Sequence, residues 1–233
     1  MHHPENQAIA RLLKRDQKRL LALCESFDLV SGTELSVHGR ELSHAYFPLT
    51  CLVSLVLDID SHPSQQVGMI GAESMLGSEL VLGISKTPWR AVVQVVGSCL
   101  RIESSVLRKL LPDMPALVGL LERTLMIRVH QMSLASSCER SHPLSQRLAR
   151  WLLMFQDRAQ TDHFHVTQEF ISSMLGVRRV GVTGAAIGFH KMGLIEYRRG
   201  ELKVLDHEGL EAQACSCYEA DKLLFTELMS LKT

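Results

Sequence analysis

Two basic pairs near the C-terminal end of the sequence have the chemistry needed to bind nucleic acid. Arg178-Arg179 lies two residues after a glycine, and Arg198-Arg199 directly precedes one. An arginine can donate two hydrogen bonds to a guanine or pair with a backbone phosphate. An apolar neighbour such as Val180 can contact a thymine methyl group. The predicted DNA-contacting residues are Thr167, Gln168, Arg178, Arg179, Val180, Thr183, Arg198 and Arg199.

The elements that must position these side chains follow from residues 166–205. Thr167 suits the N-cap of a first helix, Gly176 allows a tight turn, and a second helix begins near Arg178. In a helix-turn-helix, the N-terminal end of the second helix enters the major groove. Residues 196–205 form two short strands joined at Arg199-Gly200, which is typical of a basic wing. The pattern predicts a winged helix-turn-helix that binds double-stranded DNA.

The same pattern also occurs in proteins with other functions. A helix-turn-helix shape also occurs in small helical cores, and winged helices are reused as protein-binding modules. The alternative is therefore a ligand-binding interaction module whose winged helix contacts a protein partner. The sequence contains no nucleophile elbow, phosphate-binding glycine loop or zinc-protease helix, so we do not expect an enzyme.

Charge and hydropathy limit the partners and the compartment. Lysine plus arginine equals aspartate plus glutamate at 25 each, so a DNA-binding surface must be a local patch. No apolar run approaches the roughly 18 to 20 residues needed to cross a bilayer, and the first residues lack a secretory pattern. We expect a cytoplasmic protein with no membrane partner.

The six cysteines are scattered, which favours reduced thiols. Cys215-Ser216-Cys217 places two thiols close together, but a structural zinc site needs four ligands at recognisable spacing. No second pair stands out in the sequence. We therefore expect no metal site and interpret Cys215 and Cys217 as unpaired thiols near a tail helix.

The remainder of the chain has two further parts. Short β-rich runs between Val30 and Ile102, separated by turn residues, predict an antiparallel roll. A long helix follows from about Pro115 toward Ser137, and one of its stripes could pair with a second copy of the chain. That stripe could also pack on the roll. The predicted dimer residues are Val118, Leu121, Leu125, Arg128, Met132 and Ala135.

These observations predict an α+β fold. An antiparallel β-roll with flanking helices spans residues 1–114, a long dimerisation helix and hinge span 115–140, and a winged helix-turn-helix spans 141–233.

The order of these parts resembles the Crp/Fnr superfamily of bacterial regulators over nearly the whole chain. Several strings are similar to one branch of that family: residues 44–48 (HAYFP), 53–56 (VSLV), 68–77 (GMIGAESMLG) and 90–94 (RAVVQ). The resemblance implies a cyclic-nucleotide-binding-like roll that senses a small effector, and a homodimer that binds a palindromic operator. An activator of this type would also contact RNA polymerase. Activation and repression both remain open.

The resemblance also implies where an effector would bind. Gly71 and Glu73 match the family's Gly-Glu turn, Arg90 lies near its Arg-Ser pair, and Ser133 lies on the long helix. No serine follows Arg90, so cyclic AMP is not expected. Glu73 and Arg90 could instead pair with each other or remain solvated at the edge of a vestigial pocket. The effector, if one exists, is unidentified.

Two further departures from the family are visible. The N-terminal region offers only Cys24 before Cys51, which excludes the family's iron-sulfur cluster. No cofactor is therefore identified. Along the recognition helix, Val180 and Gly184 stand where the best-known members carry a glutamate and a second arginine. We expect a different operator sequence.

Overall fold

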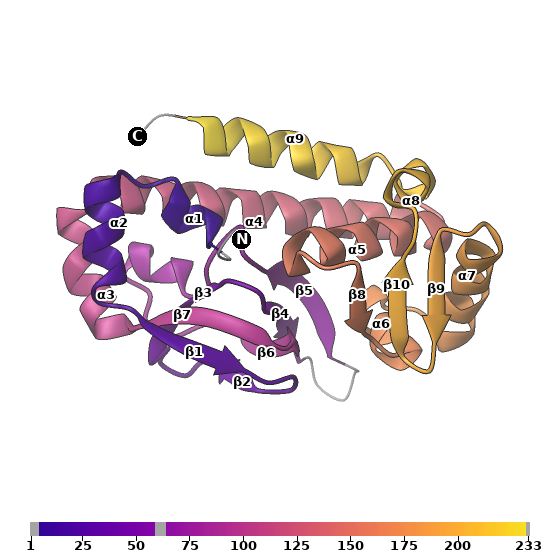
Figure 1. Ribbon diagram of the computed structural model, residues 1–233, viewed down its shortest axis with the longest axis horizontal. Coiled ribbons are helices and arrows are strands. Elements are labelled where there is room, and N and C mark those ends of the chain that lie inside the picture. The colour runs from indigo at the N-terminus through magenta and orange to yellow at the C-terminus, as the bar shows by residue number, and fades with distance from the viewer. Residues whose placement is uncertain (1–4, 59–63, 232–233) are drawn as a thin grey trace.

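The computed structural model describes residues 5–58 and 64–231 (Figure 1). A β-roll lies at one end, a three-stranded sheet with short helices lies at the other, and one long helix runs past both. This is the predicted α+β architecture, with an antiparallel roll followed by a long helix and a winged helix-turn-helix.

The roll consists of two antiparallel sheets, with strand orders β1-β7-β3 and β2-β6-β4-β5. Its strands are β1 (Glu25–Leu29), β2 (Glu34–Ser36), β3 (His44–Pro48), β4 (Leu52–Leu57), β5 (Gln65–Ile70), β6 (Arg90–Val95) and β7 (Gly97–Glu103). The run of apolar residues in β4 is buried on both faces. Val53 and Leu55 belong to the interior of the roll, whereas Leu52 packs with Trp151 of the C-terminal domain. The two domains therefore share apolar core.

Short helices complete the N-terminal part. They are α1 (Gln7–Ala10), α2 (Lys14–Leu21), the 3-10 turn η1 (Ser78–Leu82), α3 (Ser104–Leu110) and the 3-10 turn η2 (Leu111–Asp113). The side-chain oxygen of Asn6 caps α1 by accepting from the Ala8 and Ile9 amides. Its side-chain nitrogen donates to the carbonyls of Pro48 and Ser74. This one buried side chain ties the N-terminal helices to the roll.

The long helix is α4 (Pro115–Ser141), and it packs on the roll through part of the stripe predicted for dimerisation. Leu121 is fully buried, and Arg128 donates to the Ser78 hydroxyl and the Met75 carbonyl inside the protomer. The prediction that Leu121 and Arg128 face a second subunit is wrong, because the roll packs against the face of α4 that carries both residues. The most exposed apolar residues of α4 are Met126 and Val129, with 55% and 56% of their surface exposed.

The C-terminal part contains α5 (Leu144–Ala159), β8 (His163–His165), α6 (Gln168–Leu175), α7 (Arg179–Lys191), β9 (Ile195–Arg198), β10 (Glu201–Val204), α8 (His207–Gln213) and α9 (Cys217–Ser230). The strands form an antiparallel sheet of order β8-β10-β9, so a third strand completes the predicted hairpin. Within the described ranges, no helix is long and apolar enough to span a bilayer.

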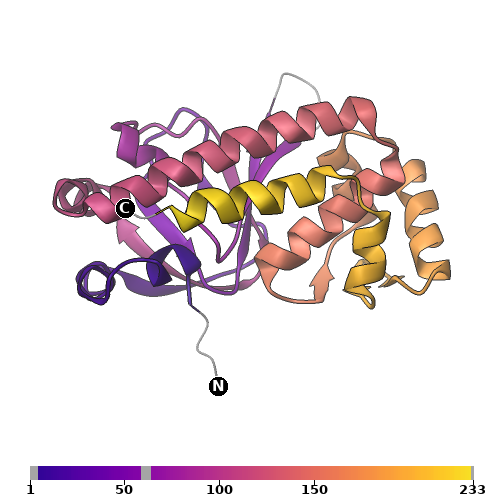
Figure 2. The ribbon, with the colours of Figure 1, turned by 90° about the horizontal axis from the view of Figure 1, so that it is seen from above.

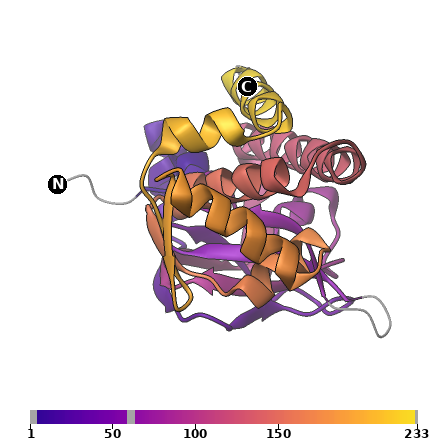
Figure 3. The same cartoon turned by 90° about the vertical axis from the view of Figure 1, so that its right-hand side faces the viewer.

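The last helix, α9, runs back along α4 and does not stay with the winged helix (Figures 1 and 2). Seen end-on, α4 and α9 lie together on one side of the roll (Figure 3). Gln131 of α4 donates to the Asp221 carboxylate of α9 over 3.2 Å, and the Arg11 guanidinium lies 5.7 Å from the centre of the Phe225 ring. The C-terminal segment therefore links the winged helix, the long helix and the N-terminal region.

Candidate nucleic-acid interface

The turn between α6 and α7 has the geometry that the sequence predicts. The Thr167 hydroxyl accepts from the Phe170 amide over 3.1 Å and caps α6. Gly176 ends α6 with φ of 63°, in the left-handed region that favours glycine. After two more residues, α7 begins at Arg179. The backbone thus presents the N-terminal end of α7 to solvent.

Packing decides which side of α7 is free. Val182, Ala186 and Phe189 are buried in the C-terminal core, and Val180 is 75% exposed on the opposite side. Arg178 and Arg179 are exposed as well. The exposed side carries both charged and apolar groups, which can reach phosphates and thymine methyl groups respectively.

Two of the predicted contact residues are brought together by α6 and α7. The Thr183 hydroxyl lies 2.7 Å from the Gln168 side-chain oxygen and 3.0 Å from the Arg179 carbonyl. Gln168 is the first residue of α6 and Thr183 is the fifth residue of α7, so this contact fixes the start of α6 against the N-terminal half of α7. The arrangement limits the rotation of both polar side chains.

The wing is a hairpin whose turn places two arginines at its tip. Arg199 and Gly200 have φ values of 54° and 87°, which suit a two-residue hairpin turn. Glu201 binds the imidazoles of His163 and His165 at 3.1 and 2.8 Å and so joins the hairpin to β8. Residues 163–203 contain six lysines and arginines against three glutamates, although the whole chain is neutral. The basic charge is therefore local.

The residues suggested for an effector do not meet in one pocket. The Glu73 side chain is largely buried, and its carboxylate lies 3.5 Å from the Arg158 guanidinium of α5. Burial raises the pKa of Glu73, and the positive charge of Arg158 opposes that rise. The suggestion that Glu73 pairs with Arg90 or remains solvated is wrong, since Arg158 reaches Glu73 from the C-terminal domain.

Arg90 has partners of its own on the outside of the roll. Its guanidinium donates to both oxygens of Asp58 over 2.6 and 2.9 Å and to the Ser64 hydroxyl over 3.0 Å. Hydrogen bonding from Arg90 lowers the pKa of Asp58 to about 2. Ser133 is exposed on α4 and donates to the Val129 carbonyl. The Gly71 amide donates to the Glu73 carboxylate over 3.1 Å, whereas Arg90 and Ser133 have other partners.

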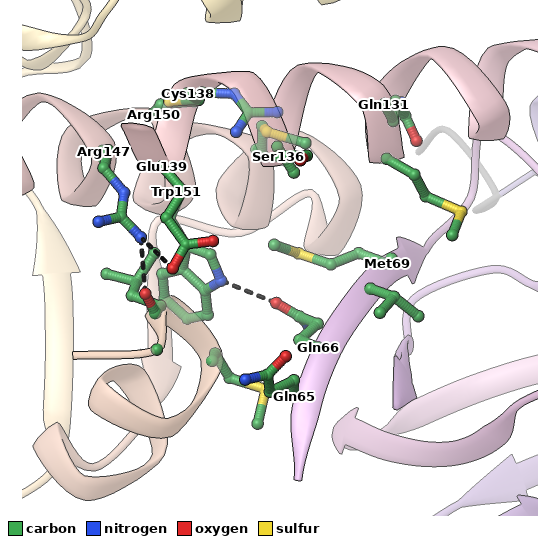
Figure 4. Close-up of a pocket in the computed structure, with 18 residues that line it drawn as sticks. Gln65, Gln66, Met69, Gln131, Ser136, Cys138, Glu139, Arg147, Arg150 and Trp151 are labelled. Atoms are coloured by element: carbon green, nitrogen blue, oxygen red, sulfur yellow. Dashed lines mark hydrogen bonds and ion pairs between the residues drawn. The ribbon is translucent and has the colours of Figure 1, made fainter. Parts of the chain in front are cut away.

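A cavity lies instead at the junction of the two domains (Figure 4). It has a volume of about 270 Å³ and is bounded by β5, α4, α5 and α6. Trp151 of α5 donates to the Gln66 side-chain oxygen of β5 over 2.8 Å, and Arg147 donates to the Leu175 carbonyl over 2.6 Å. This cavity could not be predicted from the sequence, because its walls come from segments far apart in the chain.

A second feature that the sequence analysis missed is a cluster of four side chains with metal-ligating atoms. Cys138, His142, Cys215 and Cys217 place their sulfur and imidazole nitrogen atoms within 4.8 Å of one another. The expectation that Cys215 and Cys217 have no second pair beside them is wrong, because Cys138 and His142 supply it. Their Cys-x3-His spacing, read on the end of the long helix, is the pattern that could have found them.

Comparisons with known proteins agree with this geometry. Residues 146–213, which include α6, α7 and the wing, match the Crp-like helix-turn-helix domain. The structure is similar to FixK2 from Bradyrhizobium japonicum, with a TM-score of 0.69 and 14% identity over 82% of this chain and 98% of that chain. A comparison with curated proteins gives no match.

Two proteins of Thermus thermophilus are similar in structure as well. A transcriptional regulator of the CRP family has a TM-score of 0.65 at 17% identity, covering 82% of this chain and 96% of that chain. A transcriptional regulator of the CRP/FNR family has a TM-score of 0.65 at 18% identity, covering 82% of this chain and 98% of that chain. At these identities the likeness concerns the fold.

Proposed function

Because this chain carries a Crp-like helix-turn-helix domain on the fold of Crp/Fnr regulators, we propose that it is a sequence-specific transcription regulator. It binds a palindromic operator in double-stranded DNA as a homodimer, in the cytoplasm. The observation that carries this proposal is the exposed N-terminal end of α7, with Arg178, Arg179 and Val180 facing solvent beside a basic wing.

The predicted contact residues have different roles in DNA binding. Arg179 donates to a base edge in the major groove, and Val180 contacts a thymine methyl group. Thr183 and Gln168, already in contact, reach the phosphate backbone at the helix ends. Arg198 and Arg199 of the wing pair with phosphates further along. The exposed Val180 favours an operator with a thymine at the position that α7 faces.

The homodimer forms along α4. Met126 and Val129 are exposed apolar residues three positions apart, so both can face a second copy of the same helix. The predicted residues Val118, Leu125, Met132 and Ala135 are at least partly exposed beside them and extend the same surface. A two-fold axis along α4 would place two copies of α7 on the two half-sites of one operator.

Control by a small effector would act at the domain junction. The cavity between β5, α4, α5 and α6 touches both domains, so a ligand there would change how α7 is held relative to α4. Cyclic AMP is a poor candidate, because Arg90 lies outside this cavity and its guanidinium is engaged by Asp58. An activator of this kind would also contact RNA polymerase.

The experiment is selection of DNA from a random pool by the purified protein at two salt concentrations. We expect an inverted repeat to be enriched, and Arg179→Ala to lose about 1 to 3 kcal/mol at one base position of each half-site. Arg15→Ala, an exposed arginine on α2, is the matched control and should leave the selected sequence unchanged.

Two results would speak against the proposal. Enrichment that survives Arg179→Ala unchanged would show that α7 does not read the bases. Binding that is no stronger than background at low salt, in both variants and the wild type, would favour a winged helix that contacts a protein partner.

A further inference from the structure

The end of α4 and the beginning of α9 bring four potential metal ligands together from two distant parts of the chain. We propose that Cys138, His142, Cys215 and Cys217 form a structural metal site that binds one zinc ion. Cys138 also lines the cavity at the domain junction, so the site lies at the edge of that cavity. It would act by fixing the end of the long helix to the C-terminal helix.

The distances between the ligand atoms fit a single tetrahedral ion. Zinc–sulfur bonds of about 2.3 Å and zinc–nitrogen bonds of about 2.0 Å require tetrahedron edges of about 3.8 Å between sulfurs and about 3.5 Å between sulfur and nitrogen. The sulfurs of Cys138 and Cys215 are 3.4 Å apart, and the Cys217 sulfur lies 3.7 Å from His142 Nδ1. Small side-chain movements would therefore complete the site.

The local backbone explains why all four groups point to one place. Cys138 and His142 are four residues apart at the end of α4, so their side chains lie on the same face, one turn apart. His142 is the C-cap residue, and its amide donates to the Cys138 carbonyl over 3.0 Å. Cys215 precedes α9 and Cys217 is its first residue, so the chain curves around the same point.

The identity of the donors selects the ion. Three thiolates and one imidazole in tetrahedral order are a common structural zinc set, whereas magnesium and calcium require oxygen ligands. An iron-sulfur cluster needs its ligands spread around several metal atoms, and four ligand atoms within 4.8 Å leave room for one ion. Zinc is the divalent ion that best matches this arrangement.

The charge around the cluster also suits a zinc–thiolate centre. One zinc ion with three thiolates and a neutral imidazole carries a net charge of −1. Arg150 of α5 is buried, and it lies close enough for its positive charge to act on the sulfurs of Cys138 and Cys217. Among the described residues, its Nε has no hydrogen-bond partner. A buried cation beside the anionic centre would compensate that charge.

Buried cysteines are often simple apolar packing residues, and this interpretation applies to the cysteines inside the roll. The present cluster differs in two respects. Its three sulfurs form a small buried group apart from the main cores, with Leu134 packed against it. The fourth member is an imidazole whose Nδ1 faces a sulfur. Apolar packing alone does not account for that nitrogen.

The position of the site indicates its role. His142 and Pro143 connect α4 to α5, the first helix of the C-terminal domain. A metal held by His142 and by both cysteines beside α9 would restrict this hinge and hold α9 along α4. Metal binding would then stabilise one relative placement of α4 and the winged helix.

The test uses the full chain, purified under reducing conditions from cells supplied with zinc. We expect about one zinc per chain by mass spectrometry of the metal content. Replacement with Co²⁺ should produce the intense visible bands of tetrahedral cobalt and a sulfur-to-cobalt charge-transfer band. Protein without bound zinc that also gives no such bands with Co²⁺ would overturn the proposal.

Variants locate the site. Loss of a group that only orients a ligand weakens metal affinity by about 10- to 100-fold, so Cys215→Ser, which removes a ligand itself, should weaken it by about 100-fold or more. His142→Ala should weaken binding in the same sense. Cys24→Ser, a half-buried thiol outside the cluster, is the matched control and should retain the metal.

Further outcomes separate zinc binding from other uses of the cysteines. Full metal affinity in Cys215→Ser would overturn the proposal. If a variant fails to fold by circular dichroism, the cobalt titration of the wild type decides the matter alone. Metal content is measured without DNA, so its result does not depend on the proposed function.

Discussion

The carboxylate of Glu73, on the turn after β5, lies 3.5 Å from the guanidinium of Arg158, near the end of α5. The same guanidinium lies 3.5 Å from the Asp221 carboxylate of α9 and donates to the Met154 carbonyl. One buried arginine therefore joins the roll, the winged-helix domain and the C-terminal helix.

Replacing this arginine should destabilise the whole chain. Arg158→Met leaves Glu73 and Asp221 buried without their shared cation, and loss of one partner of a buried ion pair costs about 3 to 5 kcal/mol. Urea unfolding at pH 7 should show a loss of that order. Arg140→Met, an exposed arginine at the end of α4, is the control and should change the free energy of unfolding by less than about 0.5 kcal/mol. Equal effects of the two variants would contradict the role of Arg158.

The same pair predicts a pH dependence. Burial raises the pKa of Glu73 in the folded chain. Such a carboxyl contributes its stabilisation below its unfolded pKa of about 4.3 and loses it as the pH rises through the folded pKa. Glutamine does not titrate, so Glu73→Gln removes this loss. As the pH rises from about 4 to 7, the free energy of unfolding of the variant should therefore increase relative to that of the wild type. A difference that stays constant over this range, as expected for the exposed Glu208→Gln, would refute the assignment.

A substitution at Gly71 tests how closely the roll and the C-terminal domain approach each other. A Cβ atom at this position would overlap the Arg158 backbone carbonyl and lie far inside the normal contact distance. Gly71→Ala should therefore lower the melting temperature by several degrees, as a loss of 1 kcal/mol or more does at this chain length. Gly188→Ala is the same substitution in α7, where the Cβ meets no atom within 4 Å. It should be neutral or stabilising, because alanine favours a helix over glycine by about 1 kcal/mol.

Substitution of the wing arginine Arg199 distinguishes the effect of its charge on DNA binding from the effect of its backbone conformation on stability. Its φ of 54° is unfavourable for residues other than glycine, so Arg199→Gly should not reduce the melting temperature. The variant should still bind DNA more weakly, and the slope of log affinity against log salt should fall by about 1. Fluorescence anisotropy across a salt series measures both quantities. An unchanged slope would exclude a phosphate contact by Arg199.

Two substitutions on α4 distinguish its two faces. Val129→Glu places a charge on the exposed face, so sedimentation should show a shift from dimer to monomer while the protomer stays folded. Leu121→Ala removes a fully buried side chain, and the free energy of unfolding should fall by about 2 to 5 kcal/mol. A dimer that survives Val129→Glu would move the subunit interface to another surface.

Much of the architecture could be predicted from local patterns. Alternating short runs and turn residues predicted the antiparallel roll, and Thr167, Gly176 and Arg199-Gly200 predicted the winged helix-turn-helix. These features depend on neighbours in the chain: a cap, a left-handed turn residue or a hairpin turn acts within a few residues. The local concentration of positive charge near α7 was visible for the same reason.

The sequence by itself determined the types of elements, their order and the basic end of the recognition helix, because short-range backbone preferences specify them. Only the tertiary structure decided that Arg128 faces the roll, that Arg158 reaches Glu73, and that Cys138 meets Cys215, 77 residues away. These contacts depend on how helices rotate and pack when they bury apolar surface. A helix with two apolar faces, such as α4, does not specify which face meets which partner until the whole chain is folded.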